Sequence, residues 1–534
     1  MEERLRRLEE TNERLLKQLD SLSRQYENLA QRVGDPAVQP VEAQVSAGAA
    51  GGGGTSKPAV GDAAGRGAEG TIGRGTNNAN GAKQDGQSTA VPEADGTNVT
   101  GNQTRGAQGT TARGTSEEKP RSIKTTLSNG LKWKSDDDEF ELIFHNLTQA
   151  ELRSFPGLGG HSVLKDSFFI PRQRWYITGR ATKNVEFYTS INRGYGSLDL
   201  LDAFITLNYD PRIRFRVGRT KTPTSYEYYQ IAEGDLIAPE RSLYTGNLSG
   251  NRQDGFMFLG QVLDDRAEYA LGVFNGPRRS FQDFNNDKDL FAFFNVRPFE
   301  KSKSLKALNY LNIGGEFDFG NQNNPVQPSS FRTANDQSSA GTAATLNTLS
   351  PSFLSFNNNV VENGYRDHYS AWVVWYYKSF NLLAQFDGGT QTYATGANTT
   401  RVGVPIDGYF VQAFYFLTGE QISRRVDVKP LRNFGFRGGR LTGPGGIELH
   451  ARYSGLNISR DVFNGGLADP NLWSNNAYAI DTGVNWYLNQ YTKVYFDWQH
   501  AEFSQGIFNG SNAAGKTDLT RATNLFWLRF QLFF

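Results

Sequence analysis

The C-terminal segment 524–534 alternates apolar and polar side chains with a period of two. The apolar positions are Phe526, Leu528, Phe530, Leu532 and Phe534. Between them lie Arg529 and Gln531. A transmembrane barrel strand has this pattern, because one face contacts lipid and the other lines an aqueous lumen. An edge strand of a soluble sheet is the alternative, but such edges are usually blunted by charge or proline. The pattern therefore favours a barrel strand that runs to the last residue.

Segments of the same kind recur through 122–534, and the connections between them alternate between short and long. Short polar turns are expected at 179–184, 209–212, 263–266, 377–379 and 488–491. Long connections rich in Asn, Gly and Ser are expected at 320–365, 387–407 and 455–475. One rim of short turns and one of long loops are typical of an up-and-down barrel.

Counting these segments predicts an all-β fold, a barrel of about sixteen antiparallel transmembrane strands. We expect the strands to begin near residues 139, 168, 185, 198, 212, 255, 267, 290, 308, 369, 380, 409, 447, 478, 492 and 523. An even number of this size suits a pore with an aqueous lumen. One connection breaks the pattern: 419–445 should be a short turn but has about 25 residues, against a usual two to five in a hairpin. Either a strand is miscounted there or the segment is a periplasmic extension.

The N-terminal segment 1–34 has a heptad pattern that predicts a coiled-coil oligomerisation helix. The core positions are Leu5, Leu8, Asn12, Leu15, Leu19, Leu22, Tyr26, Leu29 and Val33. Leu16 and Ala30 broaden the apolar stripe beyond the narrow seam of a dimer, which favours a trimer. A single amphipathic helix on a globular domain is the alternative. It is disfavoured because the following segment 35–121, rich in Gly, Ala, Thr and Asn, predicts a disordered linker with no core.

Composition narrows the function classes further. The chain has 534 residues, no Cys, 2 Met and 58 Gly, with 13% aromatic residues and a net charge of +1. The lack of Cys excludes disulfides and thiolate metal sites. The balanced charge gives no reason to expect a nucleic-acid partner, so an ion preference must come from local placement. Five scattered histidines predict no metal site, cofactor or enzymatic centre. Residues 1–20 are too charged for a signal peptide, so an exported chain is expected to have lost its leader.

Several motifs in the barrel region resemble those of one family. They are Arg172-Gln-Arg174, Leu201-Asp-Ala-Phe204, Val217-Gly-Arg219-Thr-Lys221-Thr-Pro223, Glu240-Arg241-Ser242, and the segments 409–420, 446–454 and 482–489. In type and order they are similar to the phosphate- and polyphosphate-selective porins of the bacterial outer membrane. The resemblance implies a homotrimer of sixteen-stranded barrels, with the third external loop folded into each pore. The strand count independently makes 220–254 the third long connection. The coiled coil and linker lie outside the match.

Candidate site residues come from strand parity and from these motifs. If Ile213 and Val217 face lipid, alternate arginines of the same strand face the lumen about 7 Å apart. The pore-lining, anion-binding candidates are Arg172, Arg174, Arg212, Arg214, Arg216, Lys221, Arg241, Arg452 and Arg529. The constriction-loop candidates are Arg219, Pro223, Glu240 and Ser242. Guanidinium groups lower the barrier for anions by replacing part of their hydration with charge-assisted hydrogen bonds.

Carboxylates on the same parity keep a second interpretation open. Asp202, Glu448, Asp481 and Asp497 also face the lumen. The arginines and carboxylates would then pair and brace the wall and the loop as a scaffold. The loop itself carries Glu227, Glu233, Asp235 and Glu240 against Arg241 and Arg252. This departs from the dense basic lining of the family and favours a channel of broader substrate range.

Two functions follow as hypotheses. The first is an outer-membrane porin for passive diffusion of small hydrophilic solutes, with a preference for small inorganic or organic anions. The second is a structural tether that links the outer membrane to the cell wall through the coiled coil. Both place the barrel in outer-membrane lipid and the N-terminal region in the periplasm. An open lumen favours the first and a plugged lumen the second.

Overall fold

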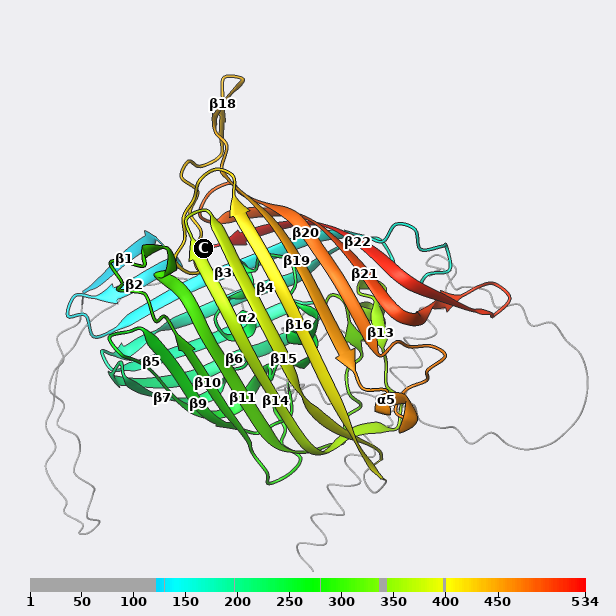
Figure 1. Cartoon of the computed structure of the whole chain (residues 1–534). Helices are drawn as coiled ribbons and strands as arrows, with labels where there is room; N and C mark the ends of the chain where they lie inside the picture. The colour runs from blue at the N-terminus through cyan, green and yellow to red at the C-terminus, as the bar shows by residue number, and fades with distance from the viewer. Residues whose placement is uncertain (1–121, 129, 196, 279, 336–342, 397–399) are drawn as a thin grey trace, which may run out of the picture. The chain divides into compact units, whose positions relative to one another are not determined.

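The alternating segments form one antiparallel sheet that closes on itself (Figure 1). The computed structural model describes residues 122–534 except 129, 196, 279, 336–342 and 397–399. The predicted coiled coil and linker lie outside the described residues. Of the eighteen strands in the sheet, β1 and β2 form a hairpin joined to the edge of β3, and the other sixteen form the closed wall. The predicted sixteen-stranded antiparallel barrel is therefore confirmed.

The first half of the wall is β3 (Glu141–Ser154), β4 (Ser167–Thr182), β5 (Val185–Gly194), β6 (Ser197–Asp210), β7 (Ile213–Lys221), β8 (Arg252–Val262), β9 (Ala267–Phe274) and β10 (Asp289–Val296). The second half is β11 (Tyr310–Asn324), β14 (Val360–Tyr377), β15 (Phe380–Thr395), β16 (Arg401–Phe416), β19 (Gly446–Ile458), β20 (Asn476–Tyr487), β21 (Thr492–Ser511) and β22 (Thr517–Phe533). Each strand pairs with its neighbours in the chain, and β22 closes the wall against β3, with Phe530 opposite Ala150.

Alternation of burial along the strands explains why these sequences form a membrane wall. On β22, Phe530 is 54% exposed and Phe526 is 49% exposed, whereas Arg529 between them is fully covered. Apolar side chains thus project outward, where lipid can cover them, and polar side chains project into the lumen. No helix among the described residues is long and apolar enough to cross a membrane.

The connections form the two predicted rims, with two differences. All five predicted short turns are present. The predicted long connection 387–407 is wrong, because β15 continues to Thr395 and β16 begins at Arg401. The polar residues there belong to strands because they face the lumen, as does Gln391, whose amide oxygen accepts a hydrogen bond from the Tyr393 hydroxyl.

The segment 417–445 is an extension and not a miscounted strand. It carries the small hairpin of β17 (Gly435–Arg437) and β18 (Arg440–Gly443), which projects from the short-turn rim (Figure 1).

The hairpin of β1 (Ile123–Ser128) and β2 (Gly130–Ser135) extends the sheet at the seam of the barrel. The last residue, Phe534, pairs through its backbone with Asn146 of β3. Beyond that point β2 takes over the edge of β3 and pairs with 141–144. The hairpin therefore covers backbone groups that β22 is too short to reach.

The third long connection, 222–251, folds into the lumen as predicted. It contains α2 (Tyr226–Tyr229), the 3₁₀ turn η1 (Glu233–Asp235) and α3 (Leu243–Leu248). Its apolar residues pack on inward-facing apolar side chains of the wall, so that Ile231 and Leu236 join one cluster and Leu243 joins another. Burial of this surface holds the loop inside the barrel.

The remaining described elements lie in connections between wall strands. They are η2 (Lys306–Leu308), β12 (Phe331–Arg332), α4 (Ala343–Leu349), β13 (Ser352–Leu354) and α5 (Asp461–Asn464). The strands β12 and β13 pair with each other in the connection between β11 and β14.

Candidate functional site

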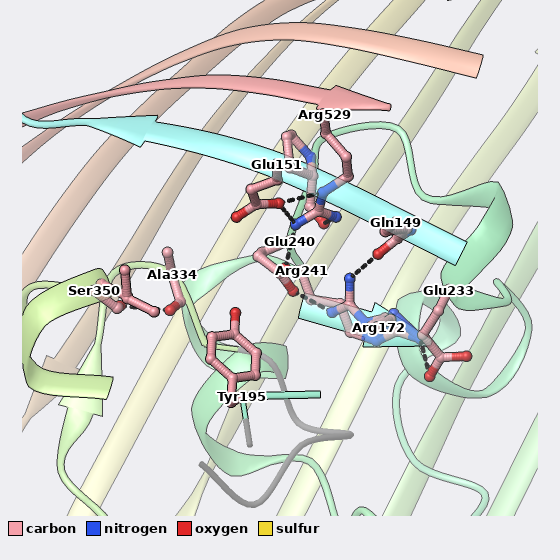
Figure 2. Close-up of polar contacts among 12 residues, drawn as sticks. Gln149, Glu151, Arg172, Tyr195, Glu233, Glu240, Arg241, Ala334, Ser350 and Arg529 are labelled. Carbon is pink, nitrogen blue, oxygen red and sulfur yellow. Dashed lines mark hydrogen bonds and ion pairs between the residues drawn. The ribbon is translucent and has the colours of Figure 1, made fainter. Parts of the chain in front are cut away.

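Glu240, at the return of the third loop, is bound between two arginines of the wall (Figure 2). Its carboxylate lies 2.6 Å from Arg172 Nη2 on β4 and 2.7 Å from Arg529 Nη2 on β22. Arg529 also binds Glu151 on β3, and its Nη1 donates to the carbonyl of Pro239. All four charged side chains are buried. Buried charges are stable only when paired, so these contacts fasten the loop to the seam of the barrel.

Glu233, in the 3₁₀ turn of the loop, is surrounded by four cations. Its carboxylate lies 2.9 Å from Arg174 and 3.4 to 3.5 Å from the other three. Those three are Lys221, Arg241 and Arg252. Burial acts to raise the pKa of Glu233, but the attraction of the cations is stronger and holds that pKa well below its ordinary value. Glu233 is therefore an anion at neutral pH and compensates cations from the wall and the loop.

Glu227, in the first helix of the loop, binds a later residue of the loop, Ser242, and a residue of the wall, Arg452. It accepts hydrogen bonds from the Ser242 backbone N–H at 3.0 Å and from the Ser242 hydroxyl at 2.7 Å. Arg452 on β19 donates to the same carboxylate at 3.3 Å and to the carbonyl of Glu240 at 3.0 Å. Arg452 also binds Asp481 on β20 at 3.0 Å. The loop is thus also tied to β19, three strands from β22 along the wall.

Six of the predicted anion-binding residues therefore already have carboxylate partners. They are Arg172, Arg174, Lys221, Arg241, Arg452 and Arg529. The predicted inward carboxylates are also paired: Asp202 with Arg252, Glu448 with Arg425, Asp481 with Arg452, and Asp497 with His450. The scaffold interpretation fits these residues better than the anion-binding one.

Arg214 and Arg216 differ, because neither has a carboxylate partner among the described residues. Both line a cavity of about 570 Å³ between the wall and the third loop. Arg216 donates from Nε to the hydroxyl of Thr206 at 3.1 Å. Its guanidinium carbon lies 4.1 Å from the centre of the Phe204 ring. The cavity reaches the short-turn rim near Gln261 and extends inward to the cluster around Glu233.

Two predicted site residues lie elsewhere. Arg212 is in the turn before β7, where its exposed side chain binds Asp210 at 2.5 Å, so β7 itself carries only Arg214 and Arg216 of the predicted ladder. Arg219 is at the end of β7 but contacts the next long loop, donating to the carbonyl of Ser280 at 2.9 Å and covering the Phe281 ring. Arg219 is therefore not part of the constriction. Arg219 also has the same parity as Ile213 and Val217, opposite to that of Arg214 and Arg216.

Sequence reasoning did not place several buried charged residues of the barrel, among them Glu151, Arg153, Arg252 and Arg425. Glu151 and Arg153 on β3 bind each other, and strand parity could have identified both. Arg252 was counted in the loop, but its pairing with Asp202 depends on how the loop returns. Arg425 comes from the 417–445 extension, reaches the lumen to bind Glu448 and donates to the carbonyl of Asp235 at 2.8 Å. No periodicity in that segment indicates an inward position.

Comparison with known proteins gives one family. The family model described as phosphate-selective porin O and P matches residues 160–534. No curated protein matches the chain.

The similar solved structures share little sequence with the chain. OmpT, an outer membrane protein of Vibrio cholerae in its trimer form, is 10% identical, with a TM-score of 0.44 over 74% of this chain and 100% of that one. An anion-selective porin from Comamonas acidovorans gives the same identity, TM-score and coverage. The outer membrane channel DcaP of Acinetobacter baumannii is 9% identical, with a TM-score of 0.42 over 75% of this chain and 99% of that one.

The family match begins just before β4 and includes the whole wall from there to β22, the third loop and both of its fastening points on β4 and β22. A family of outer-membrane porins agrees with a closed barrel whose outer face is apolar. It points to a channel and not to an enzyme. The chain belongs to the family of phosphate-selective porins O and P.

Proposed function

We propose that the protein is a passive diffusion channel for small hydrophilic solutes, with an anion preference set by Arg214 and Arg216. The observation that carries this proposal is that both guanidinium groups line the cavity of about 570 Å³ without a carboxylate partner among the described residues. An ion that enters a pore must exchange part of its hydration for contacts with the wall. Unpaired guanidinium groups supply such contacts to anions and repel cations.

The described cavities suggest a route for the solute. On the long-loop side, a cavity of about 90 Å³ is lined by Asn251, Arg278 and Glu362. Asn251 lines this outer cavity, and the next residue, Arg252, lines the inner one. The two cavities therefore approach each other at the end of the third loop, where Arg252 binds Asp202 at 3.1 Å. Because the other basic residues are paired, we expect a broad preference for anions and not strict phosphate selection.

Assembly and placement belong to the same proposal. We expect a homotrimer in outer-membrane lipid, with segment 1–121 on the periplasmic side and its heptads holding three chains together. The tether to the cell wall is a second candidate. It is favoured by the burial of loop residues such as Leu248 and Tyr228, whose side chains are fully covered.

The test is ion selectivity of the full-length protein in planar bilayers. The reversal potential in a KCl gradient is measured for the wild type and for the double variant Arg214→Gln/Arg216→Gln. The matched control is Arg212→Gln, which removes an arginine from the same region that is exposed and already paired. We expect chloride preference in the wild type and the control, and a severalfold loss of that preference in the double variant. Equal selectivity in all three would contradict the role of these arginines, and a folded barrel without conductance would leave only the tether.

A further inference from the structure

A row of aromatic rings lines the cavity beside Arg216. The rings belong to Phe533, His145, Tyr176, Tyr188 and Phe204, which come from the five adjacent strands β22, β3, β4, β5 and β6. The ring centres of Phe533 and His145 are 6.1 Å apart, and those of Phe533 and Tyr176 are 6.2 Å apart. Tyr176 and Tyr188 are also 6.2 Å apart, and Tyr188 and Phe204 are stacked at 5.1 Å. The row therefore has no gap and ends where Phe204 meets Arg216.

Aromatic rings also line the opposite side of the cavity. Tyr229 of the third loop contacts Phe293 of β10, with ring centres 5.0 Å apart. The cavity of about 570 Å³ lies within the usual size range of small-molecule sites, roughly 300 to 1,000 Å³. Aromatic surface in contact with water is unfavourable and is stabilised when a flat apolar group covers it. Inorganic phosphate would leave this surface uncovered.

We propose that this cavity binds aromatic carboxylates, which have a flat apolar ring and a single anionic group. The carboxylate would bind Arg214 and Arg216, whose planar guanidinium groups match its geometry. The ring of the solute would lie against Tyr188 and Phe204, next to the bound carboxylate. This inference rests on the proposed anion channel and specifies its substrate class.

Two other ligand classes are the natural competitors. A small aliphatic anion can use the arginines but not the rings. A neutral sugar or alcohol can stack on the rings but does not gain from the charges. A site that needs both features therefore distinguishes benzoate from acetate, which lacks the ring, and from benzyl alcohol, which lacks the charge.

The test is equilibrium binding of sodium benzoate, acetate and benzyl alcohol to the folded full-length protein, measured by titration calorimetry. We expect benzoate to bind at least about tenfold more tightly than either of the others, since one aromatic contact and one charged contact each contribute about a factor of ten. The variant Tyr188→Leu/Phe204→Leu is expected to weaken benzoate about tenfold and leave acetate unchanged. Arg214→Gln/Arg216→Gln should weaken both anions.

The control is Phe258→Leu, which removes a ring from the outward face of β8, where Phe258 is 42% exposed. It should leave benzoate affinity unchanged. Equal affinity for benzoate and acetate in the wild type would overturn the proposal, as would benzyl alcohol binding as tightly as benzoate. The reversal potential in KCl reports the anion channel separately, because chloride uses no ring. Anion preference without benzoate preference would therefore overturn this inference alone.

Discussion

Two groups of arginines share the lumen, and they differ in what surrounds them. Arg172 and Arg529 are buried, paired with Glu240 and fixed at the seam of the barrel. Arg214 and Arg216 line an open cavity and have no carboxylate partner among the described residues. All four satisfy the same strand parity. The difference arises because the third loop brings Glu240 to the seam, Glu227 to β19, and Glu233 to cations of β4, β7 and β8, but brings no carboxylate within ion-pair distance of Arg214 or Arg216.

The contrast separates stability from selectivity. A paired, buried arginine contributes to holding the loop, and its charge is largely cancelled for a passing ion. An unpaired arginine at a cavity wall contributes little to the fold, but its field acts on the solute. Substitutions in the first group should therefore change the unfolding of the barrel, and those in the second should change ion preference. The following predictions test that division, beginning with the largest effect.

Removing the Glu240 charge should have the largest effect. In Glu240→Gln, Arg172 and Arg529 both lose a buried carboxylate partner, and we expect the free energy of unfolding to fall by about 3 kcal/mol. Thermal unfolding followed by circular dichroism in detergent measures this loss. The control is Glu139→Gln, which removes a partner of Lys183 at 3.4 Å in a more exposed pair and should cost less than about 1 kcal/mol. Equal melting curves for both variants would show that the Glu240 pairs do not hold the loop.

Asp235, two residues after Glu233, offers a pH-dependent comparison within the loop. Burial raises the pKa of Asp235 to about 6, although the charge of Arg425 acts to lower it. A folded-state pKa above the unfolded one means that this group favours folding at low pH, and that its contribution is lost as pH rises through about 6. Asp235→Asn should therefore stabilise the protein by about 2 to 3 kcal/mol at pH 8 and by less than about 1 kcal/mol at pH 4.

The measurement is the denaturant midpoint of Asp235→Asn and wild type at both pH values. Asn can still accept the hydrogen bond that the Asp427 N–H donates to Asp235 at 3.1 Å, so the variant mainly removes charge. A gain of the same size at pH 4 and pH 8 would mean that packing, and not ionisation, causes it. In contrast, Glu233 is held ionised by its cations and should show no such dependence between pH 6 and pH 8.

Much of the wall could be predicted because lipid imposes a strict period of two. The sequence shows which positions of β22 face outward, and the structure agrees at Phe530 and Arg529. The same pattern also identifies the third loop, because counting the alternating short and long connections makes it the third long one. Alternation fails where polar residues fill both a strand and its connection, as at β15 and β16, whose ends extend further than predicted.

Pairing inside the lumen could not be predicted in the same way. Strand alternation predicts that Arg172 and Arg216 both face inward. Which of them meets a carboxylate of the third loop depends on the path of that loop in three dimensions. The four cations around Glu233 come from β4, β7, the loop and β8. Arg425 reaches the lumen from an extension without periodicity. Contacts among such distant segments leave no local pattern in the sequence.

The smallest expected effect is the change in the free energy of unfolding when a cavity arginine is replaced. This prediction completes the comparison. Arg216→Gln removes an unpaired charge while Gln can still donate a hydrogen bond to Thr206, so the free energy of unfolding should change by less than about 1 kcal/mol. The same thermal melts used for Glu240→Gln measure it, with Arg172→Gln as the matched substitution in the paired group. Arg172→Gln leaves Glu240 with one partner fewer in a buried site and should cost about 3 kcal/mol.

If the two arginine variants melt together, carboxylate pairing does not divide the lumen into a scaffold and a selectivity region. If only Arg172→Gln melts early, the anion preference of the pore can be altered at Arg216 without loosening the loop, because the two groups of arginines are energetically independent.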